Sequence, residues 1–284
     1  MDRLLRDAGG GQIDLLSYDA NGDLADIDGT TAPTLTVTDS AGVAVAGLTP
    51  SRVSTGTYRA TLPNNFDVLD VYDIVWSWGN GQSRRSQFEL VGRHLFTQAD
   101  LRAYDAALSN ESKYLDATVR IVRDEVTERF EEVAAVSFIP RGTRDTLSGD
   151  GSATLVLERM EARSLISVTV DGTALSPGEL ANVKLHRNGV IEYDGGHFAA
   201  GIRNVVVFYE HGYLTPPLPV VRAAKKYARY LLLNAVIDQN ERATAVFSDV
   251  GGYRLTIAGR DGPTGLPEVD AVLAQFGRMV PGFA

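Results

Sequence analysis

The chain has 284 residues, contains no cysteine, and carries a formal net charge of -9 at pH 7. Its length leaves room for two ordinary domains. The lack of thiols excludes disulfides, iron–sulfur clusters and thiolate zinc sites, and the acidic balance argues against nucleic acid as the main partner. No apolar run reaches membrane-spanning length, and residues 1–7 are too charged and too short for a signal peptide. We therefore expect a protein of the cell interior with no membrane partner.

Residues 1–93 predict an immunoglobulin-like antiparallel β-sandwich. This segment contains no lysine and a single glutamate, Glu89, but many Asp, Thr and Gly residues. Apolar and polar residues alternate at 34–38, 72–78 and 87–90, and this period of two is typical of strands with one buried face. Turn residues separate the runs, as the short strands of a sandwich require.

Two tryptophans leave two interpretations of the predicted sandwich open. Trp76 and Trp78 share one face of the same predicted strand. If that face is buried, both belong to the core, which is the usual outcome for tryptophan in a sandwich. If both are exposed, they form a stacking platform, and the protein is a carbohydrate- or host-surface-binding module on a helical stalk.

Residues 94–284 predict an α-helical bundle that carries an inserted β-layer, which makes the expected fold class α+β. Capping residues and apolar residues recurring every three or four positions predict helices at about 97–109, 112–135, 217–238 and 267–276. Strand-like runs between 136 and 210 predict the β-insert. Within it, Asp171-Gly172 is a strong hairpin signal.

A basic cluster lies on the helix expected at 217–238. Its four members share one helical face: Arg222, Lys225, Lys226 and Arg229. A solvated face is the ordinary explanation for such a cluster. The alternatives are docking to an acidic surface, such as that of a second copy of this chain, and, more weakly, binding of nucleic acid.

The sequence contains no recognisable catalytic or metal-binding constellation. None of the four histidines has a second ligand at helical metal spacing, and both the nucleophile elbow and the Walker phosphate loop are missing. Glu210-His211 comes closest to an acid–base pair, but a packing histidine is the ordinary interpretation. We therefore expect no enzymatic activity, no metal and no cofactor, although a hydrolase is kept as the weakest alternative.

One segment is similar to the start of a calcium-binding loop. Residues 19–23 read Asp-Ala-Asn-Gly-Asp, but Leu24 and Thr30 stand where that loop needs its glycine and its bidentate glutamate. An Asp-rich β-turn is therefore the preferred interpretation.

Three stretches carry a resemblance to a known family. Residues 97–101 read Thr-Gln-Ala-Asp-Leu; residues 205–212 read Val-Val-Val-Phe-Tyr-Glu-His-Gly, ahead of a proline-led helix; and residues 265–273 read Gly-Leu-Pro-Glu-Val-Asp-Ala-Val-Leu. With the long helix to Ala135 and the β-insert, they resemble head-to-tail adaptor (connector) proteins of the neck of long-tailed bacteriophages. The resemblance covers about two thirds of the chain, and the N-terminal sandwich lies outside the minimal adaptor.

This resemblance implies a structural virion protein rather than an enzyme. Such adaptors form a homo-oligomeric ring, commonly a dodecamer, between the portal protein and the stopper or tail-completion protein. The ring continues the channel through which DNA passes as cargo. The implied location is the neck of the virion, with the host cytoplasm as the site of assembly.

The resemblance also implies which surfaces meet partners. The segment 262–284 becomes the candidate portal contact through five apolar residues: Val269, Val272, Leu273, Phe276 and Phe283. The basic face formed by Arg222, Lys225, Lys226 and Arg229 becomes the candidate subunit contact. Hairpin tips near Asp150 and Asp194 become candidates for the channel or the next ring.

Overall fold

The structure is a computed structural model that describes residues 2–6, 11–27, 32–45, 48–63, 66–79, 81–234, 245–248, 251–254 and 262–277. Its contacts divide the chain into two compact units. Unit 1 comprises Met1–Arg93 and Pro140–His211, and unit 2 comprises His94–Ile139 and Gly212–Ala284. This division does not follow the predicted boundary between 1–93 and 94–284, because residues 140–211 group with the N-terminal segment.

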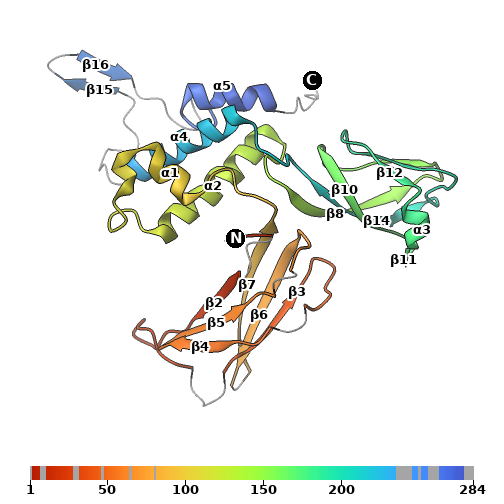
Figure 1. Cartoon of the computed structure of the whole chain (residues 1–284), viewed down its shortest axis with the longest axis horizontal. Coiled ribbons are helices and arrows are strands. Elements are labelled where there is room, and N and C mark those ends of the chain that lie inside the picture. The colour runs from red at the N-terminus through yellow and green to blue at the C-terminus, as the bar shows by residue number, and fades with distance from the viewer. Residues whose placement is uncertain are drawn as a thin grey trace. The chain divides into compact units, whose positions relative to one another are not determined.

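The N-terminal part of unit 1 consists of two sheets that enclose one core (Figure 1). The first has the order β1 (Asp2–Leu5), β7 (Gln82–Val91), β6 (Val71–Trp78), β3 (Thr34–Thr38). The second has the order β2 (Gln12–Leu16), β5 (Thr57–Thr61), β4 (Ser51–Ser54). The strands predicted from alternation at 34–38, 72–78 and 87–90 are confirmed. One pair departs from an antiparallel arrangement, because β1 runs parallel to β7.

The second part of unit 1 is a further pair of sheets. The larger has the order β11 (Thr173–Ala174), β10 (Ala162–Val170), β14 (Gly201–His211), β8 (Arg141–Gly149). The smaller has the order β12 (Val183–Leu185), β13 (Val190–Tyr193), β9 (Thr154–Val156), and the short helix α3 (Pro177–Leu180) precedes β12. The predicted hairpin at Asp171-Gly172 is confirmed, since both residues have positive φ values, 50° and 78°, between β10 and β11.

Backbone contacts join these two parts of unit 1. The Gly92 N–H donates a hydrogen bond of 2.9 Å to the Pro140 carbonyl. A Cβ atom added to Gly142 would lie only 1.7 Å from the Leu69 carbonyl oxygen. Strand β8 therefore approaches the N-terminal sheets so closely that only glycine fits at position 142.

These findings contradict the expected fold class. Across the described residues, sixteen strands in five sheets accompany only five α-helices, so the protein is mostly β and is not a helical bundle with an inserted β-layer. The prediction of strands within residues 136–210 is correct. The prediction that helices enclose these strands is wrong. Strand β8 packs against the N-terminal sheets, where Glu89 of β7 binds Arg141 at the start of β8, instead of being enclosed by helices.

Unit 2 contains α1 (Gln98–Tyr104), the 3-10 helix η1 (Ala106–Ser109), α2 (Asp116–Ala134), α4 (Leu218–Asn234) and α5 (Pro267–Phe276). Helix α4 packs against α1, α2 and α5. As predicted, Thr97 caps α1, and its hydroxyl accepts a hydrogen bond of 3.0 Å from the Asp100 N–H. The expected helix at 97–109 is interrupted at Asp105, whose carboxylate caps η1 instead. Positions 235–238 of the helix expected at 217–238 lie outside the described residues.

Among its described residues, unit 2 also contains one pair of strands. Strands β15 (Ala245–Ser248) and β16 (Gly251–Arg254) pair as an antiparallel hairpin that the sequence patterns had not predicted. Within the segments that the structure describes, no helix combines the length and apolar character needed to cross a membrane.

Candidate functional site

A cleft of about 510 Å³ lies in unit 1 between the large sheet and two N-terminal loops. Its walls come from the turn after β3 and from the segment that leads into β6. Its floor is the outer face of β8, β14 and β10. The residues that define its chemistry are Ser40, Asp70, Val71, Arg144, Thr146 and Val206.

The alternation of the large sheet explains why these side chains face the cleft. Val206 lies between Thr146 and Thr169 in the strand register, and all three line the cleft. Their neighbours Asp145 and Val207 point to the opposite face and are buried. The period of two therefore gives the sheet a threonine-bearing outer face over a mostly apolar inner face that also holds the buried Asp145.

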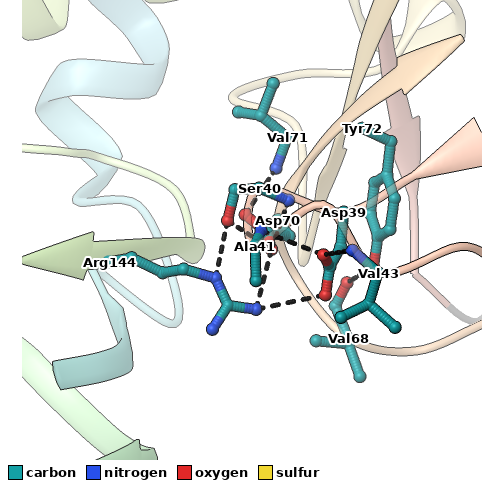
Figure 2. Close-up of polar contacts among 9 residues, drawn as sticks. All are labelled: Asp39, Ser40, Ala41, Val43, Val68, Asp70, Val71, Tyr72 and Arg144. Atoms are coloured by element: carbon teal, nitrogen blue, oxygen red, sulfur yellow. Dashed lines mark hydrogen bonds and ion pairs between the residues drawn. The ribbon is translucent and has the colours of Figure 1, made fainter. Parts of the chain in front are cut away.

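Arg144 is the central residue of the cleft (Figure 2). Its guanidinium carbon lies 3.7 Å from the centroid of the Phe208 ring, a cation–π contact. Its Nε donates a hydrogen bond of 2.7 Å to the Ser40 hydroxyl. Its Nη2 lies 3.3 Å from a carboxylate oxygen of both Asp39 and Asp70. Arg144 is therefore held by an aromatic face, a hydroxyl and two carboxylates.

The Asp70 carboxylate is buried and organises the N-terminal wall of the cleft. It accepts hydrogen bonds from the Ser40 hydroxyl at 2.7 Å and from the Val71 N–H at 2.8 Å (Figure 2). The same carboxylate acts on Tyr72, since burial first, and then the negative charges of Asp70 and Asp39, raise the pKa of its phenol. Two carboxylates thus face a single guanidinium, so negative charges outnumber positive ones in this cluster.

The lining of the cleft is part polar and part apolar. Its side chains supply hydroxyls, methyl groups and carboxylates, and they include no nucleophile paired with a histidine base. Among the described residues, no three or more histidine and carboxylate side chains are grouped so that they could hold a metal ion.

The predicted basic face of α4 is largely engaged within unit 2. Lys226 forms an ion pair with Glu268, and Arg229 forms an ion pair with Asp105. The ammonium group of Lys225 lies 5.5 Å from the centroid of the Tyr104 ring. Arg222 is exposed and makes no hydrogen bond or ion pair with any other described residue. The subunit contact stays a prediction, and Arg222 is the member of the set best placed to test it.

The predicted portal-contact residues of α5 divide into two groups. Val269 and Leu273 are completely buried and belong to the core of unit 2. Val272 and Phe276 are partly exposed, and the Phe276 ring packs edge-on against Phe138 with centroids 6.2 Å apart. Phe283 lies outside the described residues. The buried pair holds α5 in place, so Val272 and Phe276 are the described members that a partner can reach without unfolding the helix.

The two tryptophans are not exposed together. Trp76 is only 1% exposed and belongs to the core shared by the N-terminal sheets. Trp78 is partly buried against the same core, and its indole N–H donates a hydrogen bond of 2.7 Å to the Gln82 side chain. This geometry favours the core interpretation over a stacking platform for carbohydrate.

Two other sequence candidates have structural roles. The Asp19 carboxylate accepts hydrogen bonds from the N–H groups of Asn21 and Asp23 at 2.8 and 3.0 Å, which is the predicted Asp-rich turn. His211 is buried, and desolvation, followed by the nearby charges of Arg141 and Arg159, lowers its pKa to about 3. A histidine that stays neutral over the physiological range is suited to packing rather than to proton transfer.

The sequence patterns did not identify the cleft. Arg144 is 105 residues from Asp39 and 74 from Asp70, so no local motif joins them. Comparison with models of known protein families found no match, and comparison with curated protein sequences found none either.

Proposed function

We propose that this chain is a structural protein of a bacteriophage neck that forms a ring between the portal protein and the stopper or tail. The observation that supports the proposal best is the convergence, within unit 2, of the long helix α2, the proline-led helix α4 and the stretch 265–273, on which the resemblance to adaptors rests in part; the stretch 205–211 belongs to unit 1. In this proposal the protein acts by assembly, and DNA passes through the ring without being chemically changed.

Side-chain contacts tie these segments together. The Arg129 guanidinium of α2 donates a hydrogen bond of 2.7 Å to the Pro263 carbonyl, just before the stretch 265–273. Thr264 donates to the Asp270 carboxylate at 2.7 Å, which secures the start of α5. The ion pair between Lys226 and Glu268 joins α4 to α5. Segments more than a hundred residues apart thus form one helical unit that supports the proposal.

Unit 2 also exposes large apolar side chains, as a subunit contact requires. Among the described residues of unit 2, four such side chains are more than half exposed: Leu115, Ile121, Leu214 and Leu218. Ile121, at 65%, is the most exposed of these four. It follows Arg120 in α2, and Asp124 and Glu125 lie three and four positions further along on the same helical face. Exposed aliphatic side chains within a polar rim are typical of surfaces that meet another protein.

The decisive experiment is assembly with the portal protein. Mass photometry of the purified chain, alone and after mixing with the portal of the same phage, should reveal a ring or a defined portal complex. A chain that remains monomeric under both conditions would contradict the proposal.

A pair of variants makes this test specific. Ile121→Ser should weaken assembly by about tenfold or more without lowering the melting temperature, because the side chain contributes little to the isolated fold. The matched control is Val156→Ser, which changes an equally exposed aliphatic residue that lies in unit 1 instead of unit 2. Equal effects of the two substitutions would count against α2 as a contact surface.

A further inference from the structure

The junction between the ends of β8 and β14 carries an unusually exposed apolar residue. Ile202 is 90% exposed. Gly201 pairs with Gly149 and Val205 pairs with Leu147, so the three residues 202–204 lie opposite Ser148 alone. This is a β-bulge, a feature that redirects side chains away from the ladder. The adjacent Arg203 has a φ of 52°, which is rare for a residue with a side chain.

Hydrogen bonds hold this bulge in one conformation. The Arg203 N–H donates to the Ser148 hydroxyl at 2.9 Å. The Asn204 side chain accepts from the Gly149 N–H at 3.0 Å and donates to the Ala199 carbonyl at 3.0 Å. A Cβ on Gly149 would lie 2.0 Å from that same carbonyl oxygen, so the close approach needs glycine. Ile202 and Arg203, which we call the tip, are therefore displayed on a rigid support.

The tip combines an exposed aliphatic group with a positive charge, on a chain whose net charge is -9. Its complement is a surface with apolar patches and excess negative charge. The Arg144 cleft has both properties, because Val71, Val206 and threonine methyl groups line it while Asp39 and Asp70 outnumber the single guanidinium. Its volume of about 510 Å³ lies within the range of roughly 300–1,000 Å³ that is typical of ligand pockets.

We infer that the tip of one copy docks into the Arg144 cleft of the next copy in the assembled ring. The inference rests on the proposed function, since it requires a homo-oligomer. A contact between two different surfaces of the same chain is heterologous, and repetition of such a contact closes a ring when the rotation between copies allows it. Ile202 fills the apolar part of the cleft, and Arg203 meets the partly exposed carboxylate of Asp39.

The chain contains no cysteine, so engineered cysteines can test this contact without background. Ile202→Cys and Ala41→Cys are placed on separate, differently tagged copies that are co-expressed and mildly oxidised. Ala41 lines the cleft and is exposed, so both substitutions should leave the fold intact. We expect a disulfide-linked dimer that carries both tags, and neither single variant should give it.

The control replaces the cleft position with a distant exposed one. Val156→Cys, co-expressed with Ile202→Cys, should give at most about a tenth of the cross-linked product, because only specific docking holds two thiols at bonding distance. Efficient cross-linking of Ile202→Cys to itself would overturn the inference, since it would indicate a two-fold contact between tips.

Assembly is measured on the same samples by mass photometry. Rings that form without the mixed disulfide would overturn the docking of tip into cleft and leave the proposed neck function standing. Failure to assemble, with or without portal protein, would overturn both.

Arg203→Glu gives an independent readout of the same contact. It should weaken assembly by about tenfold or more, because a like charge would then face the carboxylates, whereas Arg203→Lys should assemble normally. Equal assembly of the two variants would contradict the electrostatic part of the inference.

Discussion

Arg3 Nε donates a hydrogen bond of 3.0 Å to the Glu89 carboxylate, and the two side chains are only 3% and 2% exposed. The two residues are direct partners in the parallel pair of β1 and β7. Arg141, at the start of β8, binds the other oxygen of the same carboxylate. The single glutamate of residues 1–93 therefore connects the N-terminal strand, the sandwich and the large sheet of unit 1.

Removing this charge should destabilise unit 1 strongly. Glu89→Gln leaves Arg3 and Arg141 close together without their shared carboxylate, and breaking a buried pair in this way costs about 3–5 kcal/mol. Urea unfolding at neutral pH measures the loss. Asp26→Asn, which breaks the exposed pair between Asp26 and Arg52, is the control and should have a much smaller effect. Similar losses in the two variants would contradict a special role for the buried triad.

Gly142 should tolerate no side chain. Gly142→Ala places a methyl group 1.7 Å from the Leu69 carbonyl oxygen, a backbone atom that cannot rotate away. We expect the substitution to lower the free energy of unfolding by about 3 kcal/mol, because β8 must move off the N-terminal sheets. The control is Gly178→Ala in α3, where an added Cβ meets no atom within 4 Å. A neutral Gly142→Ala would show that these two parts of unit 1 do not approach closely in solution.

His211 should make the protein sensitive to acid. Its pKa is lowered to about 3 by burial and by nearby arginines, whereas in the unfolded chain it titrates near its ordinary value of about 6.5. Between these values the unfolded chain binds more protons than the folded one. Stability from this group is therefore fully present above pH 6.5 and is lost as the pH falls toward 3, by at most about 1.4 kcal/mol per pH unit.

His211→Gln isolates this contribution. Denaturant midpoints at pH 7, 5 and 4 should fall less steeply for the variant than for the parent protein. His197→Gln, at an exposed histidine, should leave the slope unchanged. If the denaturant midpoints of all three proteins fell equally with pH, His211 would not be a source of acid sensitivity.

The basic face of α4 yields a prediction that separates assembly from stability. Lys226→Glu breaks the pair with Glu268, and because both side chains are about half exposed, the cost should stay below about 1 kcal/mol. Arg222→Glu breaks no described pair and should leave the melting temperature unchanged while weakening assembly in mass photometry. Normal rings from Arg222→Glu would identify the face as solvated surface.

Local patterns were sufficient to locate most elements. The alternation at 34–38 and 72–78 placed β3 and β6, because a half-buried strand must alternate in polarity whatever its neighbours are. The Thr97 and Asp100 pair marked the start of α1, since a capping box satisfies backbone donors within four residues. The Asp171-Gly172 turn followed from backbone sterics alone.

Burial was harder to predict, even inside correctly placed elements. Arg123 carries a charge in an amphipathic helix, yet it is buried and paired with Asp124. Val269 and Leu273 were assigned to a partner, yet they complete the core of unit 2. Helical periodicity identifies an apolar edge but does not identify the surface that covers it.

The sequence by itself determined where strands, helices and turns lie, since these depend on interactions between residues a few positions apart. Only the tertiary structure decided that the sheet of β8, β10 and β14 packs in the same unit as the N-terminal sheets, and that Arg144 meets Asp39 and Asp70 across 105 and 74 residues of chain. Such pairings depend on how much apolar surface each possible packing of the whole chain buries and how many charges it pairs. A local sequence period carries no information about which of these packings is the more stable.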